Sequence, residues 1–175
     1  MKGKKIVMSA LLKSVRGMHD RFFAVVSLAQ SPVLLCIRVY WGWQLWQSGW
    51  GKLHNLDKVT DFFASLHMPA PGKMAFLIAC IEFFGGIFFA LGAFSRITSL
   101  VLTVNLAMAY VLADREALLS AFSDPDKFTA AAPFNFLGAA VLILIFGAGK
   151  LSLDTALNRV LEHREAKQLA RSVTA

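Results

Sequence analysis

Residues 74–94 read MAFLIACIEFFGGIFFALGAF and carry a single ionisable side chain, Glu82. A helix of this length rises about 31 Å, which matches the hydrocarbon thickness of a bilayer. Three other apolar stretches, at residues 32–50, 97–113 and 133–149, are also long enough to cross it. The sequence therefore predicts an all-α protein built as a bundle of four transmembrane helices.

The composition favours lipid over water as the solvent. Apolar residues make up 57% of the 175 residues and charged residues 17%, which leaves too little polar surface to cover a soluble core. The two cysteines, Cys36 and Cys80, both lie inside apolar stretches, where small buried side chains are more usual than a disulfide scaffold. A redox-active pair stays open as the alternative.

Positive charge is concentrated at the two ends of the chain rather than in one patch suited to nucleic acid. The basic residues that precede the first apolar stretch and follow the last one are Lys2, Lys4, Lys5, Lys13, Arg16, Arg21, Lys150, Arg159, Arg164, Lys167 and Arg171. Because basic flanks stay in the cytoplasm, both termini are expected there. That placement requires an even number of spans, and four satisfies it. The partner predicted first is therefore the lipid bilayer, and no nucleic-acid partner is expected.

The charge distribution also divides the chain into three segments. Residues 1–31 are predicted to be a basic interfacial segment, residues 32–157 the membrane domain, and residues 158–175 a basic cytoplasmic tail. Within the first segment, residues 9–29 combine apolar side chains at helical spacing with basic ones, which is typical of an amphipathic helix on an anionic membrane surface. A frayed polar tail stays open as the alternative.

Short amphipathic helices are predicted in both loops on the opposite side. In the loop at residues 51–73, apolar side chains recur at helical spacing, namely Val59, Phe62, Phe63 and Leu66. This helix is expected to begin at Asn55 or Asp57 and to end before Pro69. A similar interfacial helix is expected in the loop at residues 114–132.

Three polar side chains lie at membrane depth, where each costs at least a few kcal/mol, and they form the candidate intramembrane site: Arg38, Glu82 and Asn105. Counted from helix ends at Lys52 and Gly72, Arg38 lies about 21 Å deep and Glu82 about 15 Å deep, so an ion pair is the simplest expectation. Such a pair either fixes the register of the bundle or belongs to a proton or quinone-headgroup site. Asn105 is the candidate third member, and a simple hydrogen bond between helices is the alternative interpretation.

Small residues on two of the predicted spans favour a close contact between them. Gly42 and Gly49 share a helical face with Arg38, and Gly86 shares one with Glu82. Glycine at such positions lets two helix backbones approach closely.

A weak metal candidate lies outside the membrane. His54, Asp57 and His67 belong to the loop that follows the first span, and the first two share a helical spacing. The default interpretation is a solvated helix face, and a metal site is the alternative.

Four short motifs resemble the DoxX family of small bacterial membrane proteins over residues 32–157. They are Arg38 followed by GWGKL at 49–53, EFFGG at 82–86, LGAFSR at 91–96 and FGAGKLSLD at 146–154. Ser48 departs from the pattern, because the family usually carries His there. Besides Arg38 and Glu82, the resemblance marks Gly49, Lys52, Gly85, Gly86, Arg96 and Asp154.

The resemblance implies a multi-pass protein of the bacterial inner membrane and a link to redox complexes. The family takes its name from a membrane subunit associated with thiosulfate:quinone oxidoreduction, and relatives are linked to soluble redox-stress partners. This chain has no haem-ligand pair in its predicted spans and no flavin fingerprint, so we expect an accessory subunit rather than a self-sufficient enzyme. No covalently bound cofactor is expected, and quinone is the candidate ligand.

Two other functions stay open from the sequence. A non-catalytic membrane scaffold would use the intramembrane charges for assembly alone. A small-solute or metal carrier would use them together with the external histidines, and would need a homo-oligomer to form its path.

Overall fold

The computed structural model describes residues 2–173, except for the side chains of residues 2–15, 18, 20, 24, 25, 169, 170 and 173. Over the described residues the protein is all-helical, without a strand. The helices are α1 (Lys2–His54), α2 (Leu56–Ser65), α3 (Pro71–Leu91), α4 (Ser95–Leu112), α5 (Arg115–Leu119), α6 (Pro125–Ala130), α7 (Pro133–Phe146) and α8 (Leu153–Val173).

Three of these helices are long and apolar enough to cross a membrane: residues 21–54 of α1, the whole of α3 and the whole of α4. The fourth apolar helix, α7, has 14 residues and therefore rises only about 21 Å. It ends at Phe146 because Gly147 adopts a φ of 76°, so it is shorter than the predicted stretch 133–149. The structure thus has three spans by length and one shorter apolar helix.

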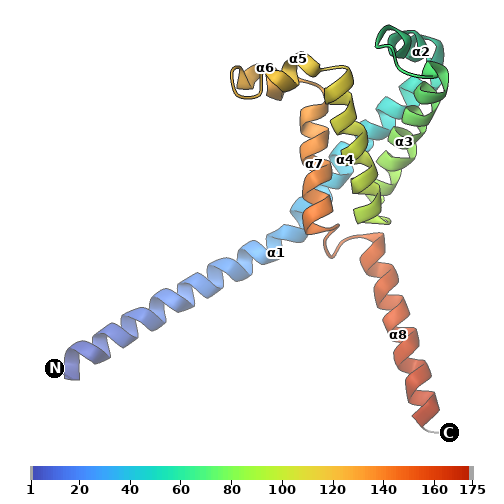
Figure 1. Ribbon diagram of the computed structural model, residues 1–175. Helices are drawn as coiled ribbons and strands as arrows, with labels where there is room; N and C mark the ends of the chain where they lie inside the picture. Colours follow the sequence, from blue (N-terminus) through green and yellow to red (C-terminus); the bar gives the residue numbers. More distant parts are fainter. Residues whose placement is uncertain (1, 174–175) are drawn as a thin grey trace.

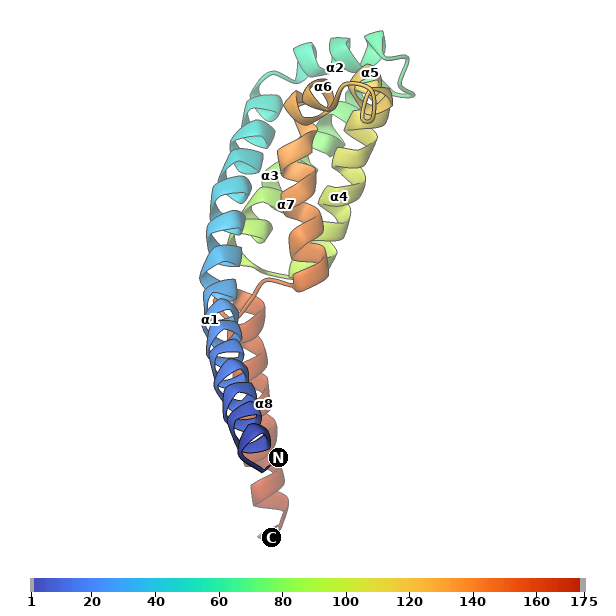
Figure 2. The ribbon, with the colours of Figure 1, turned by 90° about the vertical axis from the view of Figure 1, so that its left-hand side faces the viewer.

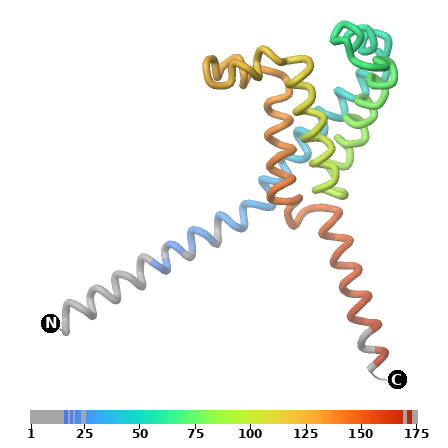
Figure 3. The backbone as a smooth tube through the Cα atoms, in the orientation of Figure 1, coloured from blue at the N-terminus to red at the C-terminus, as the bar shows by residue number. Residues whose placement is uncertain are grey.

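The bundle consists of two helix pairs, α1 with α3 and α4 with α7, joined along the contact between α3 and α4 (Figures 1 and 2). The start of α1 and all of α8 extend from one end, which we call the tail end (Figure 1). The short helices α2, α5 and α6 lie at the opposite end, the loop end. The backbone trace shows α8 leaving the bundle, and its side chains from 156 to 168 are exposed (Figure 3).

The first helix is continuous from Lys2 to His54, so the amphipathic helix predicted for residues 9–29 is not a separate element. Much of its side-chain pattern lies outside the described residues. Phe22, Phe23 and Leu28 are exposed. Their position at a membrane surface stays a prediction.

The predicted close contact between α1 and α3 is confirmed. A Cβ atom at Gly42 would lie 2.8 Å from the Gly86 carbonyl oxygen and from Ala90, and one at Gly49 would collide with the backbone of Phe83. Both helices therefore need glycine on the shared face. This contact sets the register of the pair, with Gly42 between Gly86 and Ala90 and Gly49 against Phe83.

The two loops differ from each other. The first forms α2, which begins after Asn55 and ends at Ser65, as predicted. The second forms two short helices instead of one, because Asp124 starts a new helix by accepting a hydrogen bond from the Lys127 amide. Pro133 occupies the first turn of α7, where its missing N–H costs nothing.

Candidate functional site

The charged residues inside the bundle form two separate centres, and the predicted ion pair between Arg38 and Glu82 is not formed. Arg38 donates a hydrogen bond to the Leu151 carbonyl at the tail end. Glu82 bonds instead to Ser48 and Lys52 toward the loop end. Because Gly49 lies against the backbone of Phe83, Glu82 is level with residue 50 of α1, about 18 Å along that helix from Arg38. An Arg side chain does not bridge that offset.

The first centre is a carboxylate with a matched cation and a hydroxyl donor. Glu82 is 6% exposed, accepts a hydrogen bond of 2.8 Å from Ser48 Oγ, and forms an ion pair with Lys52 Nζ. A buried carboxylate is costly unless it is paired and hydrogen-bonded, and here it is both. The partly exposed Lys52 connects the buried carboxylate to the surface of the loop end.

This centre opens onto a cavity of about 450 Å³, which we call the loop-end cavity. Apolar side chains of α1, α2, α3, α4 and α7 form most of its wall, with Phe62 and Phe63 of α2 and the following Leu66 contributing from the loop. The polar residues within its lining are Ser48, Lys52, Lys58, Glu82, Asn105 and Asp114. The structure therefore brings two predicted site residues, Glu82 and Asn105, to one cavity and leaves Arg38 outside it.

The second centre connects three distant segments at the tail end. Arg38 is fully buried between the Leu151 carbonyl and Gly92, where a Cβ atom would collide with the guanidinium group. Gly92 adopts a φ of 67° and ends α3, and its carbonyl accepts a hydrogen bond of 3.1 Å from the Asp154 amide. The start of α8 is thereby tied to the turn between α3 and α4.

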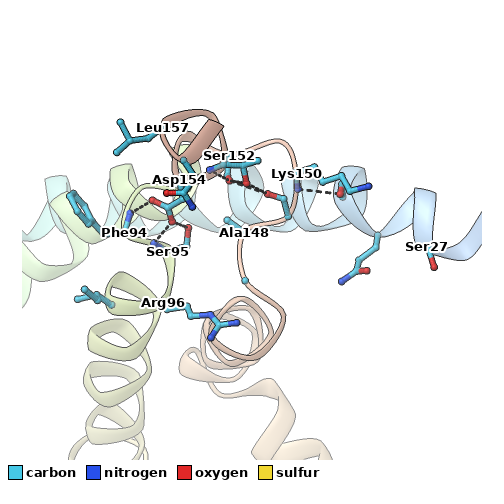
Figure 4. A pocket seen from close by; sticks show the side chains of 16 residues that line it. Ser27, Phe94, Ser95, Arg96, Ala148, Lys150, Ser152, Asp154 and Leu157 are labelled. Carbon is cyan, nitrogen blue, oxygen red and sulfur yellow. Dashed lines mark hydrogen bonds between the residues drawn. The ribbon is translucent and has the colours of Figure 1, made fainter. Parts of the chain in front are cut away.

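The Asp154 carboxylate completes this connection by capping the N-terminus of α4. It accepts hydrogen bonds from the Phe94 amide at 2.7 Å, the Ser95 amide at 2.8 Å and the Ser95 hydroxyl (Figure 4). Burial acts to raise the pKa of this carboxyl, but the bonds from Ser95 and Phe94 and the charge of Arg38 outweigh it and hold the pKa below its ordinary value of 3.8. These contacts indicate a structural role for the second centre.

Beside Asp154 lies a cleft of about 640 Å³, which we call the tail-end cleft (Figure 4). It is lined by parts of α1 and α4, the loop after α7 and the start of α8. Arg96 and Lys150 both line it, and their charged groups have no partner among the residues that the structure describes. Figure 4 shows the Arg96 side chain extending away from Asp154.

The remaining predicted residues play packing roles or stay apart. Gly85 faces Leu102, and a Cβ atom would lie 2.9 Å from it. His54 stacks on Trp50, and among the described residues no group of three or more His, Cys, Asp or Glu side chains is placed to hold a metal, so His54, Asp57 and His67 do not form one. Cys36 and Cys80 are free thiols.

Sequence reasoning missed the partners of both centres. Ser48 was noted only as a departure from a motif, although its hydroxyl bonds to Glu82. Ser95 and Gly92 belong to the LGAFSR motif, and Asp154 ends the FGAGKLSLD motif. The available signal was that each of these two motifs places polar residues at the end of an apolar stretch.

An all-helical chain with three apolar spans and buried, partnered charges between them is an integral membrane protein. The sequence model of the DoxX family matches residues 33–115, a range that includes Arg38, Lys52 and Glu82. This stretch of the chain is therefore a DoxX domain. No curated protein and no solved structure matches it.

Proposed function

We propose that this protein is an accessory subunit of a membrane oxidoreductase complex and that it binds a quinone headgroup in the loop-end cavity. The observation that carries the proposal is the buried Glu82, paired with Lys52 and Ser48, at the edge of an otherwise apolar cavity. Such a combination of apolar walls with a few convergent polar groups is typical of small-ligand sites.

The chemistry of a quinone fits this lining. Its ring is flat and apolar and suits the walls formed by Leu45, Leu106 and Phe136. Its two carbonyl oxygens need hydrogen-bond donors, and the Lys52 ammonium and the Asn105 amide are donors within the same lining.

The proposal divides the reaction between two proteins. Reduction of a quinone to a quinol consumes two electrons and two protons. The electrons come from the redox centre of a partner oxidoreductase, soluble or membrane-bound. The partly exposed Lys52 and the buried Glu82 supply a route for protons from the loop end.

The same proposal includes the placement of the chain in a bacterial inner membrane. In this placement α7 is a fourth, short span. Four spans put the start of α1 and the whole of α8 on the same side of the membrane, and both extend from the tail end of the bundle. The basic residues on both tails support a cytoplasmic location for that side.

Quinone binding is tested with purified protein in lipid nanodiscs titrated with a short-chain benzoquinone. We expect saturable binding at one molecule per chain, and an affinity at least tenfold lower in Glu82→Gln and in Asn105→Ala. Glu116→Gln is the matched control, because Glu116 is an exposed carboxylate outside the cavity. Folded Glu82→Gln protein that binds as tightly as wild type would contradict the proposal.

A membrane scaffold is the second candidate, and one observation favours it. The described part of α8 lies away from the bundle with Leu157, Val160 and Leu161 exposed, which suits a docking arm for a soluble partner. If scaffolding is the whole function, Glu82→Gln lowers the amount of assembled complex and leaves the activity per assembled complex unchanged.

A further inference from the structure

The tail-end cleft adjoins an apolar groove on the side of the bundle. The groove has a volume of about 410 Å³ and runs between α3 and α4. Phe94 and Ile97 line both the cleft and the groove, so the two share a wall. A polar cleft and an apolar groove thus meet where α4 enters the membrane region.

The charges of the cleft favour an anionic ligand. Arg96 and Lys150 line it, and neither charged group bonds to another residue in the described part of the chain. The one carboxylate in the lining, Asp154, is already engaged by the first turn of α4 and lies near the buried Arg38. The charged groups of the cleft that have no partner among the described residues are therefore both positive.

Polar groups of α1 add neutral hydrogen-bonding capacity to this cleft. Ser27, Gln30 and Ser31 form the wall opposite α4. Ser31 Oγ accepts a hydrogen bond of 3.2 Å from the Lys150 amide, which holds the loop after α7 against α1. The cleft is thus held between segments far apart in the sequence.

The groove suits a flexible hydrocarbon chain. Its lining is apolar except for Thr98, whose hydroxyl is already bonded to the Ala93 carbonyl. Phe88, Ile97 and Val101 are exposed on the outer surface of the bundle, where lipid is the solvent. Gly85 deepens the groove, because it presents no side chain over Leu102.

We propose that the cleft and the groove together bind one anionic phospholipid. Arg96 and Lys150 hold its phosphate group, and one acyl chain lies in the groove between α3 and α4. Basic pockets between helices at a membrane surface are suited to phospholipid headgroups. The site is separate from the loop-end cavity and does not depend on quinone binding.

The experiment is native mass spectrometry of delipidated protein in mild detergent, titrated with phosphatidylglycerol or phosphatidylcholine. We expect one phosphatidylglycerol per chain to bind at least tenfold more tightly than phosphatidylcholine. The double variant Arg96→Gln/Lys150→Gln removes this preference. The control Arg164→Gln/Lys167→Gln removes the same charge from exposed positions on α8 and keeps the preference.

The groove is tested separately. Val101→Trp fills it from an exposed position and is expected to weaken phosphatidylglycerol binding at least fivefold. Val104→Trp, one turn along α4 and outside the groove, is expected to bind as wild type. Glycerol phosphate, which carries the same phosphate without acyl chains, is expected not to compete.

Four results would overturn the proposal. Equal affinity for the two lipids would remove the role of the cations. An equal loss in the α8 control would indicate a general charge effect. Full competition by glycerol phosphate, or unchanged binding by Val101→Trp, would show that no acyl chain occupies the groove. Thermal unfolding of each variant identifies any that fail to fold.

Discussion

Asp154 and Ser95 are 59 positions apart in the chain, and the carboxylate of the first accepts hydrogen bonds from both the amide and the hydroxyl of the second. Asp154 therefore acts as the cap that α4 lacks in its own sequence, since Phe94 at the cap position has no side-chain acceptor. The contact ties the start of α8 to the bundle.

Removing this cap should weaken the tail end. Asp154→Ala is expected to lower the free energy of unfolding by about 1–2 kcal/mol, the usual cost of a lost cap. Asp126→Ala, an exposed acidic residue on α6, should change it by less than about 0.5 kcal/mol. Thermal or denaturant unfolding in detergent measures both. Equal effects of the two substitutions would argue against the capping role.

The same carboxylate predicts a pH dependence. Its pKa in the folded protein lies below the ordinary value of 3.8, so folding favours the ionised form. The stabilisation is fully present above pH 3.8 and is lost as the pH falls through the lower, folded pKa. The stability difference between wild type and Asp154→Asn should therefore shrink as the pH falls below 3.8. A difference that stays constant from pH 6 to pH 3 would contradict this.

Arg38 should be needed to hold α8 in place. Arg38→Met keeps much of the side-chain volume. It removes the hydrogen bond to the Leu151 carbonyl and the positive charge near the Asp154 carboxylate. We expect a loss of stability of about 3 kcal/mol or more and faster proteolysis within residues 147–158. Arg164→Met, at an exposed position on α8, should leave the cleavage rate unchanged. Protection of that loop in Arg38→Met would show that other contacts hold it.

The close contact between α1 and α3 should require glycine, because a larger residue would place a side chain between the two backbones. Gly42→Ala places a Cβ atom 2.8 Å from Gly86 and Ala90, so we expect destabilisation of about 1–3 kcal/mol. Gly138→Ala has open space around it inside α7 and should stabilise by up to about 1 kcal/mol. Thermal unfolding of the two variants tests the opposite signs. Similar shifts for both would indicate that the helices do not pack this closely.

The helical architecture was predictable because its signals are local. Hydropathy over windows of about 20 residues identified α1, α3 and α4, and Pro133 marked the start of α7. The ends were less accurate: the predicted stretches ran to 94 and 149, whereas Gly92 and Gly147 end the helices earlier by adopting positive φ.

The candidate site was predictable only in part. Arg38, Glu82 and Asn105 stood out because polar groups are costly at membrane depth. Their partners depend on helix register: counting from the loop ends aligned Lys52 with Gly72, whereas the helix contact places Gly49 against Phe83. The resulting error was large enough to pair Arg38 with the wrong residue.

The sequence by itself determined that this chain is a helical membrane protein with a DoxX domain, because apolar length and short motifs are properties of contiguous residues. Only the tertiary structure decided where the charges go. The backbone contact of Gly49 with Phe83 aligns Glu82 with Ser48 and Lys52, and the chain returns 113 residues after Arg38 to present the Leu151 carbonyl. Such pairings follow from packing between distant segments, which no local pattern encodes.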